Sequence, residues 1–260
     1  MTSLAGLSGD MILNHAFALV LILARIGATF AMMPGLGETT TPAVVKAGMI
    51  FTLTILLLPV IEPLLPPWPA NEVAFGLMLL AELANGLWFG WLARILTTSL
   101  PIAGQIVADF AGLANVLLPN PELGAQTTAV SRLYEIAVPA LILATGLYSV
   151  LIQALVGFYQ LVPPGTLAGV SDSTAMTITV VAESFNLALR LASPFILASI
   201  AWHVAIGLIA RLVPRLQIYF VALPGQIGLG LLLLAAVAAP SIGAWTDAMR
   251  EGFSSLPGGN

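Results

Sequence analysis

The chain has 260 residues, of which 59% are hydrophobic and only 8% are charged, with a formal net charge of −4. Its mean hydropathy is +1.02. A soluble globular domain carries about a quarter charged residues, so this composition predicts an integral membrane protein. The absence of cysteine excludes disulfides, thiol catalysis and cysteine-ligated metal sites. The acidic balance excludes a basic nucleic-acid-binding surface.

The apolar stretches predict an all-α membrane protein with about six transmembrane helices, because a spanning helix needs about 20 apolar residues. The first stretch follows Asp10 and lacks a basic leader, so we expect it to stay as a membrane helix. No linker divides the chain, and residues 1–260 are expected to form a single integral membrane domain. In chain order the expected spans are Met11–Met33, Ala47–Ile61, Val73–Ala93, Ile136–Leu161, Met176–Leu212 and Ile218–Ala239.

Three of these stretches carry a further expectation. The second span is short unless it begins near Val44. The fifth is too long for one perpendicular span, and Pro194 is expected to kink or break it, because proline removes a backbone donor. Between the third and fourth spans, the apolar segment Pro101–Leu118 is predicted to be a re-entrant or broken helical hairpin.

Basic residues predict the orientation of the spans. They fall in alternate connections, at Lys46, Arg94, Arg132, Arg211 and Arg215, whereas the intervening connections carry none. Cytoplasmic loops are enriched in Lys and Arg, so this pattern places both termini outside. The segment between the third and fourth spans then begins and ends on the cytoplasmic side.

Charged residues inside apolar segments need protein or water around them, because a charge at the bilayer centre costs about 3 kcal/mol on insertion scales. Two interpretations stay open. The side chains form buried ion pairs or interface contacts between helices and subunits, or carboxylates among them form a proton relay. The candidates are Arg25, Glu82, Asp109, Glu135, Glu183 and Arg190.

Other chemistry finds little support in the sequence. His15 and His203 lie far apart without a carboxylate set, which makes a poor metal site, and His203 is interpreted as a satisfied polar residue in a helix. No nucleophile elbow, P-loop or dinucleotide-binding glycine pattern is present, and no cofactor is expected. Gly86 and Gly90 form a small-xxx-small pair that favours close helix packing.

Four places in the chain carry a resemblance to a known family. The first runs from Ala24-Arg-Ile-Gly-Ala-Thr-Phe into Pro42-Ala-Val-Val-Lys46. The second and most specific joins Glu82, Gly86 and Gly90 to Ala103-Gly-Gln105, Asp109, Gly112 and Asn120-Pro121. The third is Pro163-Pro-Gly165, and the fourth joins Arg190-Leu-Ala-Ser-Pro194 to Pro214-Arg-Leu-Gln217. Over nearly its whole length, the chain resembles the flagellar biosynthetic protein FliR family, whose counterparts serve in injectisomes.

The resemblance implies a non-enzymatic subunit of the type III protein export gate in the bacterial inner membrane, at the flagellar basal body. It implies assembly with FliP-like and FliQ-like subunits into a pore that passes unfolded export substrates. FlhA-like and FlhB-like components are the further partners that it implies.

The resemblance also implies a plug in the closed pore, which maps to about residues 112–123. Glycine and proline allow that loop to turn sharply, and its apolar side chains would exclude water from a pore. Packing within the helix bundle is the alternative role of these side chains. The candidates are Gly112, Leu113, Val116, Leu117, Leu118, Pro119 and Pro121.

A second function stays open, a small secondary transporter that uses the intramembrane carboxylates. Transporters show paired repeats with interrupted helices in matching positions. Segment Pro101–Leu118 has no clear counterpart in the second half, where Pro194 is the nearest candidate. An intramembrane enzyme is a third class, for which no nucleophile or metal set is legible.

Overall fold

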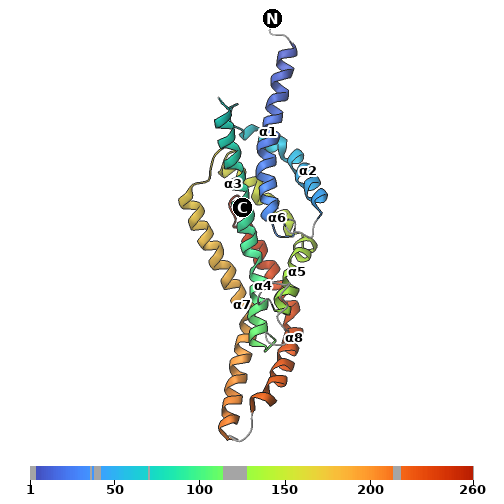
Figure 1. Cartoon of the computed structure of the whole chain (residues 1–260), viewed down its shortest axis with the longest axis vertical. Helices are drawn as coiled ribbons and strands as arrows, with labels where there is room; N and C mark the ends of the chain where they lie inside the picture. The colour runs from blue at the N-terminus through green and yellow to red at the C-terminus, as the bar shows by residue number, and fades with distance from the viewer. Residues whose placement is uncertain are drawn as a thin grey trace. The chain divides into compact units, whose positions relative to one another are not determined.

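The computed structural model describes residues 4–35, 37, 42–69, 71–113, 128–212 and 218–259. Within these ranges the chain is built of helices and contains no strand (Figure 1). The α-helices are α1 Leu4–Met32, α2 Ala43–Ile61, α3 Glu72–Thr97, α4 Ser99–Phe110, α5 Ala129–Ala144, α6 Leu147–Leu161, α7 Val170–Leu212 and α8 Ile218–Ser254, with a short 3-10 helix at Glu62–Leu64.

Among the described residues, five helical stretches are long and apolar enough to cross a membrane. The number becomes six if α5 and α6 are counted as one broken span. The prediction of an all-α, multi-pass membrane protein with about six spans and a broken helix pair is therefore confirmed.

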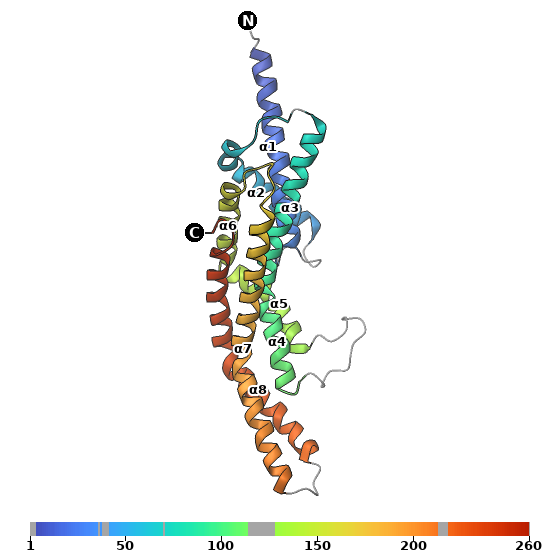
Figure 2. The same ribbon diagram turned by 90° about the vertical axis from the view of Figure 1, so that its left-hand side faces the viewer.

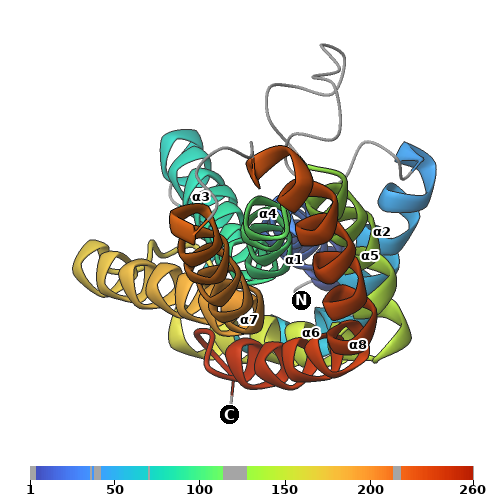
Figure 3. The same ribbon diagram turned by 90° about the horizontal axis from the view of Figure 1, so that it is seen from below.

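The residues group into two compact units. The first unit contains Met1–Ile95, Gly146–Val180 and Arg250–Asn260, and within it α1 and α3 lie side by side (Figures 1 and 2). The second contains Leu96–Thr145 and Val181–Met249, and within it α4 packs along α5 (Figure 3). The single membrane domain expected for the whole chain stays a prediction.

Polar side chains and glycines mark several helix ends. Asn71 caps α3, because its side-chain oxygen accepts a hydrogen bond from the Ala74 amide at 2.7 Å. Thr128 caps α5 in the same way, through the Ser131 amide. At the end of α4, Gly112 has a φ of +75° and the Leu113 amide donates to the Ala108 carbonyl at 2.8 Å, the pattern of a Schellman C-cap.

The segment Pro101–Leu118, where a re-entrant or broken helical hairpin is expected, is helical over its first ten residues, to Phe110, and its last five residues lie outside the described ones. Pro101 is the third residue of α4, where its missing amide hydrogen is not needed for the helix. Gly104 admits α5 at close range, since a β-carbon there would lie 2.7 Å from the Tyr134 ring. Pro101 therefore lies in the first turn of α4, and Gly104 allows α4 and α5 to pack closely.

The broken pair occurs elsewhere, inside the expected span Ile136–Leu161. Helix α5 ends at Ala144, and α6 begins at Leu147. Between them Gly146 has a φ of +72°, a conformation that L side chains rarely adopt. The Gly146 conformation thus ends the first helix of the pair.

The start of α2 fits the expectation, whereas α7 and α8 differ from it. Helix α2 begins at Ala43, which gives it the length that a start near Val44 was expected to provide. Helix α7 continues through Pro194 without a break, and α8 contains Pro224 and Pro240 and extends to Ser254, beyond the expected end at Ala239. Prolines are tolerated inside membrane helices because neighbouring groups satisfy the freed carbonyls.

Candidate functional site

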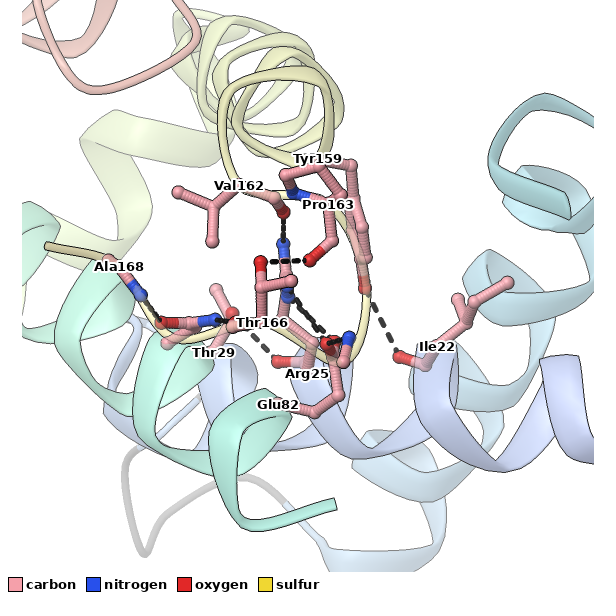
Figure 4. A network of polar contacts seen from close by, with 11 residues as sticks. Ile22, Arg25, Thr29, Glu82, Tyr159, Val162, Pro163, Thr166 and Ala168 are labelled. Atoms are coloured by element: carbon pink, nitrogen blue, oxygen red, sulfur yellow. Dashed lines mark hydrogen bonds and ion pairs between the residues drawn. The ribbon is translucent and has the colours of Figure 1, made fainter. Parts of the chain in front are cut away.

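A buried ion pair lies at the centre of the first unit. Arg25 of α1 donates from Nε to Glu82 Oε2 at 2.7 Å and from Nη2 to Glu82 Oε1 at 2.9 Å (Figure 4). Both side chains are fully buried, with 0% relative exposure. Such a two-bond contact between guanidinium and carboxylate is both strong and geometrically specific.

Both members of the pair also hold the segment that connects α6 to α7. Arg25 Nη1 donates to the Val162 carbonyl at 2.9 Å, and the Gly165 amide donates to Glu82 Oε1 at 2.6 Å. The carboxylate thus accepts three hydrogen bonds, and all three guanidinium nitrogens donate. The pair therefore fixes two helices and a loop together.

A proline-glycine turn presents the amide that Glu82 binds. The Thr166 amide donates to the Pro163 carbonyl at 3.2 Å, which closes a four-residue turn. Gly165 stands at its third position with a φ of +80°, as a type II turn requires. The Pro163-Pro-Gly165 motif therefore shapes the loop that the ion pair holds.

Asn85 holds the same loop one helical turn beyond Glu82. Its Nδ2 donates to the Thr166 carbonyl at 2.7 Å, and its Oδ1 accepts from the Ala168 amide at 3.1 Å. Residues three apart on a helix share a face. Glu82 and Asn85 thus bind successive parts of residues 162–168 from one face of α3.

Aromatic rings enclose the guanidinium. Its central carbon lies 4.2 Å from the centroid of Tyr159 and 5.2 Å from that of Phe158, both on α6. A desolvated cation over an aromatic face gains about 2 kcal/mol. The Tyr159 hydroxyl in turn donates to the Ile22 carbonyl of α1 at 3.4 Å. Helix α6 is thereby joined to α1 around the charge.

Two glycines bring α1 and α3 close enough for this pair to form. A β-carbon on Gly86 would clash with the Arg25 carbonyl and lie 2.8 Å from the Ala28 β-carbon. A β-carbon on Gly90 would lie 2.5 Å from the Thr29 carbonyl. The packing role predicted for the small-xxx-small pair is confirmed, because only glycine fits at either position.

The other charged candidates are placed differently. Glu135 pairs with Arg132 at 2.7 Å on an exposed face of α5. Asp109, also exposed, accepts a hydrogen bond from Gln105 at 3.3 Å. Glu183 and Arg190 are exposed on α7, and neither side chain forms an ion pair within the described part of the chain. Of the six candidates, the structure brings together only Arg25 and Glu82.

The first plug candidates lie at the end of α4. Gly112 packs against the Gln226 side chain of α8, whose Nε2 donates to the Phe110 carbonyl at 3.1 Å. Leu113 is half-buried. The remaining candidates, Val116, Leu117, Leu118, Pro119 and Pro121, lie outside the described residues.

The structure also identifies contributors to the centre that sequence reasoning missed. Asn85, Tyr159 and the backbone of residues 162–165 bind the pair or its loop. The signals were present, because Asn85 stands inside the Glu82–Gly86 motif and Pro163-Pro-Gly165 was one of the family-like places. The sequence alone did not show that Asn85 binds the loop or that Glu82 binds the turn.

The histidines support no metal site. His203 Nδ1 lies 2.7 Å from the Ser199 carbonyl of its own helix, which confirms its interpretation as a satisfied polar residue. Among the described residues, no cluster of three metal-ligating side chains occurs. Every side-chain nitrogen of Arg25 and both carboxylate oxygens of Glu82 form hydrogen bonds with each other or with the loop. The centre therefore stabilises the arrangement of these segments by electrostatic contacts.

The fold and this centre define a class, a multi-pass helical membrane protein whose spans are fastened by a buried ion pair. Residues 16–252 match the family described as bacterial export proteins, family 1. The flagellar biosynthetic protein FliR of Caulobacter vibrioides is 33% identical over 237 residues, which cover 91% of this chain and 94% of that protein.

Two further relatives come from different systems. FliR of Bacillus subtilis is 25% identical and covers 84% of each chain. The Yop proteins translocation protein T of Yersinia pestis is 28% identical over 86% of this chain and 87% of that protein. The chain belongs to the bacterial export proteins, family 1, in which flagellar FliR proteins and their secretion-system counterparts are found.

Proposed function

We propose that this chain is a non-enzymatic subunit of the type III protein export gate. With FliP-like and FliQ-like subunits it forms the inner-membrane pore through which unfolded substrates pass, next to FlhA-like and FlhB-like components. The carrying observation is its membership of the export family over residues 16–252. Flagellum assembly is the process we assign, because the 33% identical relative is a flagellar protein.

The distribution of burial supports a role within an assembly. Half of the most apolar window of α1 is buried within the chain, against 11% for α7 and 6% for α8. Glu183 and Arg190 are exposed on α7, where contact with lipid would be costly. Neighbouring subunits that cover this helix would supply partners for both charges.

The geometry of the ion pair supports a structural role over a proton relay. A relay carboxylate must release and accept protons along a path to water. Glu82 is instead fully buried, held by two guanidinium nitrogens and one backbone amide. We therefore assign Arg25 and Glu82 to holding α1, α3 and the connection between α6 and α7 in one arrangement.

The segment that follows α4 is our proposal for the closure of the pore. Gly112 ends the helix with a positive φ, and Gln226 of α8 binds the last helical turn through the Phe110 carbonyl. The apolar residues from Leu113 to Leu118 would then close the pore by excluding water.

Loss of the gene tests this function in the bacterium that carries it. We expect the deletion strain to stop secreting flagellar subunits, and a plasmid copy of the chain to restore secretion. The variant Glu135→Gln, which changes only an exposed pair, should restore it equally well. Normal secretion combined with the loss of uptake of a small solute would contradict the export function and favour a transporter.

A further inference from the structure

One face of α7 is exposed along most of this helix, which runs unbroken through 43 residues (Figure 2). From Glu183 to Arg211, the residues on this face follow one another at alternating steps of three and four, and every one of them is exposed. Such spacing is the heptad pattern by which long helices pack side by side. We define the heptad face by these residues: Glu183, Asn186, Arg190, Ser193, Leu197, Ile200, Val204, Gly207 and Arg211.

Neither lipid nor water suits the first part of the heptad face. Glu183 and Arg190 are charged, and lipid leaves charged side chains unsolvated. Phe185 and Leu189 lie in the same stretch of the helix with relative exposures of 55% and 51%, and contact between apolar groups and water is unfavourable. A protein surface can satisfy both kinds of side chain, so another polypeptide is the expected neighbour of this stretch.

The order of charges indicates what that polypeptide carries. Glu183 and Arg190 are seven residues apart, which is two helical turns on the same side and about 10 Å along the axis. This separation is too long for the two side chains to pair with each other, and neither forms an ion pair within the described part of the chain. A neighbouring helix with a base level with Glu183 and an acid level with Arg190 would neutralise both.

A second copy of the chain does not fit this charge order. Copies that obey the same topology rule enter the membrane the same way round, so their α7 helices run in the same direction. Level packing would then place Glu183 against Glu183 and Arg190 against Arg190, and like charges repel. A shift of seven residues would pair only one charge of each copy, and it would place the two copies at depths that differ by about 10 Å.

From these observations we propose that the heptad face binds one helix of a different protein subunit, with a basic side chain opposite Glu183 and an acidic one opposite Arg190. Asn186 lies between these two ion pairs and offers its amide to the same helix. Leu197, Ile200 and Val204 pack against apolar side chains further along. The inference deepens the proposed function, because it gives the chemistry by which a neighbouring subunit recognises this chain.

Photo-crosslinking in living cells tests the register of this contact. A photo-crosslinking amino acid replaces either Asn186 or Ser193, two exposed residues one heptad apart. We expect both variants to attach to the same protein, different from this chain, at sites about seven residues apart in its sequence. Mass spectrometry of the crosslinked peptides reads these sites. Attachment to phospholipid, to a second copy of the chain or to two different proteins would overturn the proposal.

Charge reversal tests the ion pairs themselves. In Glu183→Lys the crosslink from position 186 should fall about tenfold or more, because like charges then face each other. The control Glu135→Lys reverses an exposed charge on α5 and should leave that crosslink unchanged. Because Glu183 is exposed, the amount of chain in the membrane, measured by immunoblot, should equal that of the wild type.

The basic residue that crosslinking places opposite Glu183 is then changed to glutamate in the partner. We expect this second reversal to restore the crosslink of Glu183→Lys, and a crosslink that stays lost would overturn the proposal. The proposed function fails separately, through normal secretion in the deletion strain, because the crosslinks report the contact whatever the assembly does.

Discussion

Arg25 and Glu82 neutralise each other at a position with no exposed surface, so each side chain depends on the other. Removing one partner of such a pair leaves a charge that is both buried and unpaired. Losses of about 3–5 kcal/mol are typical in that case. Because the pair also binds Val162 and Gly165, the loss would reach the connection between α6 and α7.

We therefore predict that Glu82→Gln lowers the unfolding free energy of the purified chain by about 3 kcal/mol or more. The matched control is Glu135→Gln, which removes the charge from an exposed pair and should cost less than about 1 kcal/mol. Denaturation in detergent, followed by tryptophan fluorescence, measures both. Equal stability of the two variants would show that the buried pair does not fasten the helices.

A double variant distinguishes the cost of an unpaired buried charge from the cost of losing the ion pair. Replacing both partners by apolar residues, Arg25→Met with Glu82→Leu, removes the unpaired charge that each single variant leaves behind. We expect the double variant to be more stable than either single one, although the loop contacts to Val162 and Gly165 are lost. The same denaturation experiment checks the order, and a double variant less stable than both singles would contradict it.

Asn85 is predicted to hold the loop without carrying charge. In Asn85→Ala, the Thr166 carbonyl and the Ala168 amide lose their partners, so amide hydrogen exchange in residues 162–169 should rise at least severalfold. Asn186→Ala, at an exposed position of α7, is the control and should leave that exchange unchanged. Unaltered exchange in Asn85→Ala would show that Asn85 does not hold the loop.

At the scale of the helices, close packing of α1 on α3 depends on two glycines. Gly86→Ala places a methyl group against the Arg25 carbonyl, so the helices must separate and the ion pair must lengthen. Gly76→Ala lies on the same helix in open space and should stabilise α3 by about 1 kcal/mol through helix propensity. Thermal unfolding in detergent compares them, and two variants of equal melting temperature would contradict the packing argument.

The sequence predicted the helical class and most spans, because long apolar runs with few charges allow little else. The break between α5 and α6 was not predicted, for a physical reason. Within the segment expected to form a hairpin, Pro101 lies in the first turn of α4 and Gly104 admits α5. Gly146, which does end a helix with its positive φ, lies in a run that is apolar enough to pass for one span.

The candidate site was predictable only in part. The cost of buried charge singled out Arg25 and Glu82 separately, yet no periodicity links residues 57 positions apart on different helices. The third component, the Pro163-Pro-Gly165 turn, was one of the family-like places, but nothing in the sequence linked it to Glu82. Tertiary contacts of this kind depend on how the helices pack, which a single sequence does not specify.

At the scale of the whole molecule, the proposed plug leads to a permeability prediction. Shortening the loop by deleting residues 112–116 should leave the pore open, because apolar side chains that exclude water are removed. We expect cells that make the assembled gate with this variant to leak ions and to lose membrane potential, as a voltage-sensitive dye would report. If the variant assembles normally and the membrane stays impermeable to ions, these residues pack within the bundle and do not close the pore.

The most direct test of the central claim is a purification of the tagged chain from membranes of the bacterium that makes it. Quantitative mass spectrometry then identifies what co-purifies. We predict FliP-like and FliQ-like subunits at a fixed ratio to the chain, with severalfold less of both for Glu82→Gln and an unchanged amount for Glu135→Gln. A chain that purifies alone, and that carries a small solute across reconstituted vesicles, would contradict the claim.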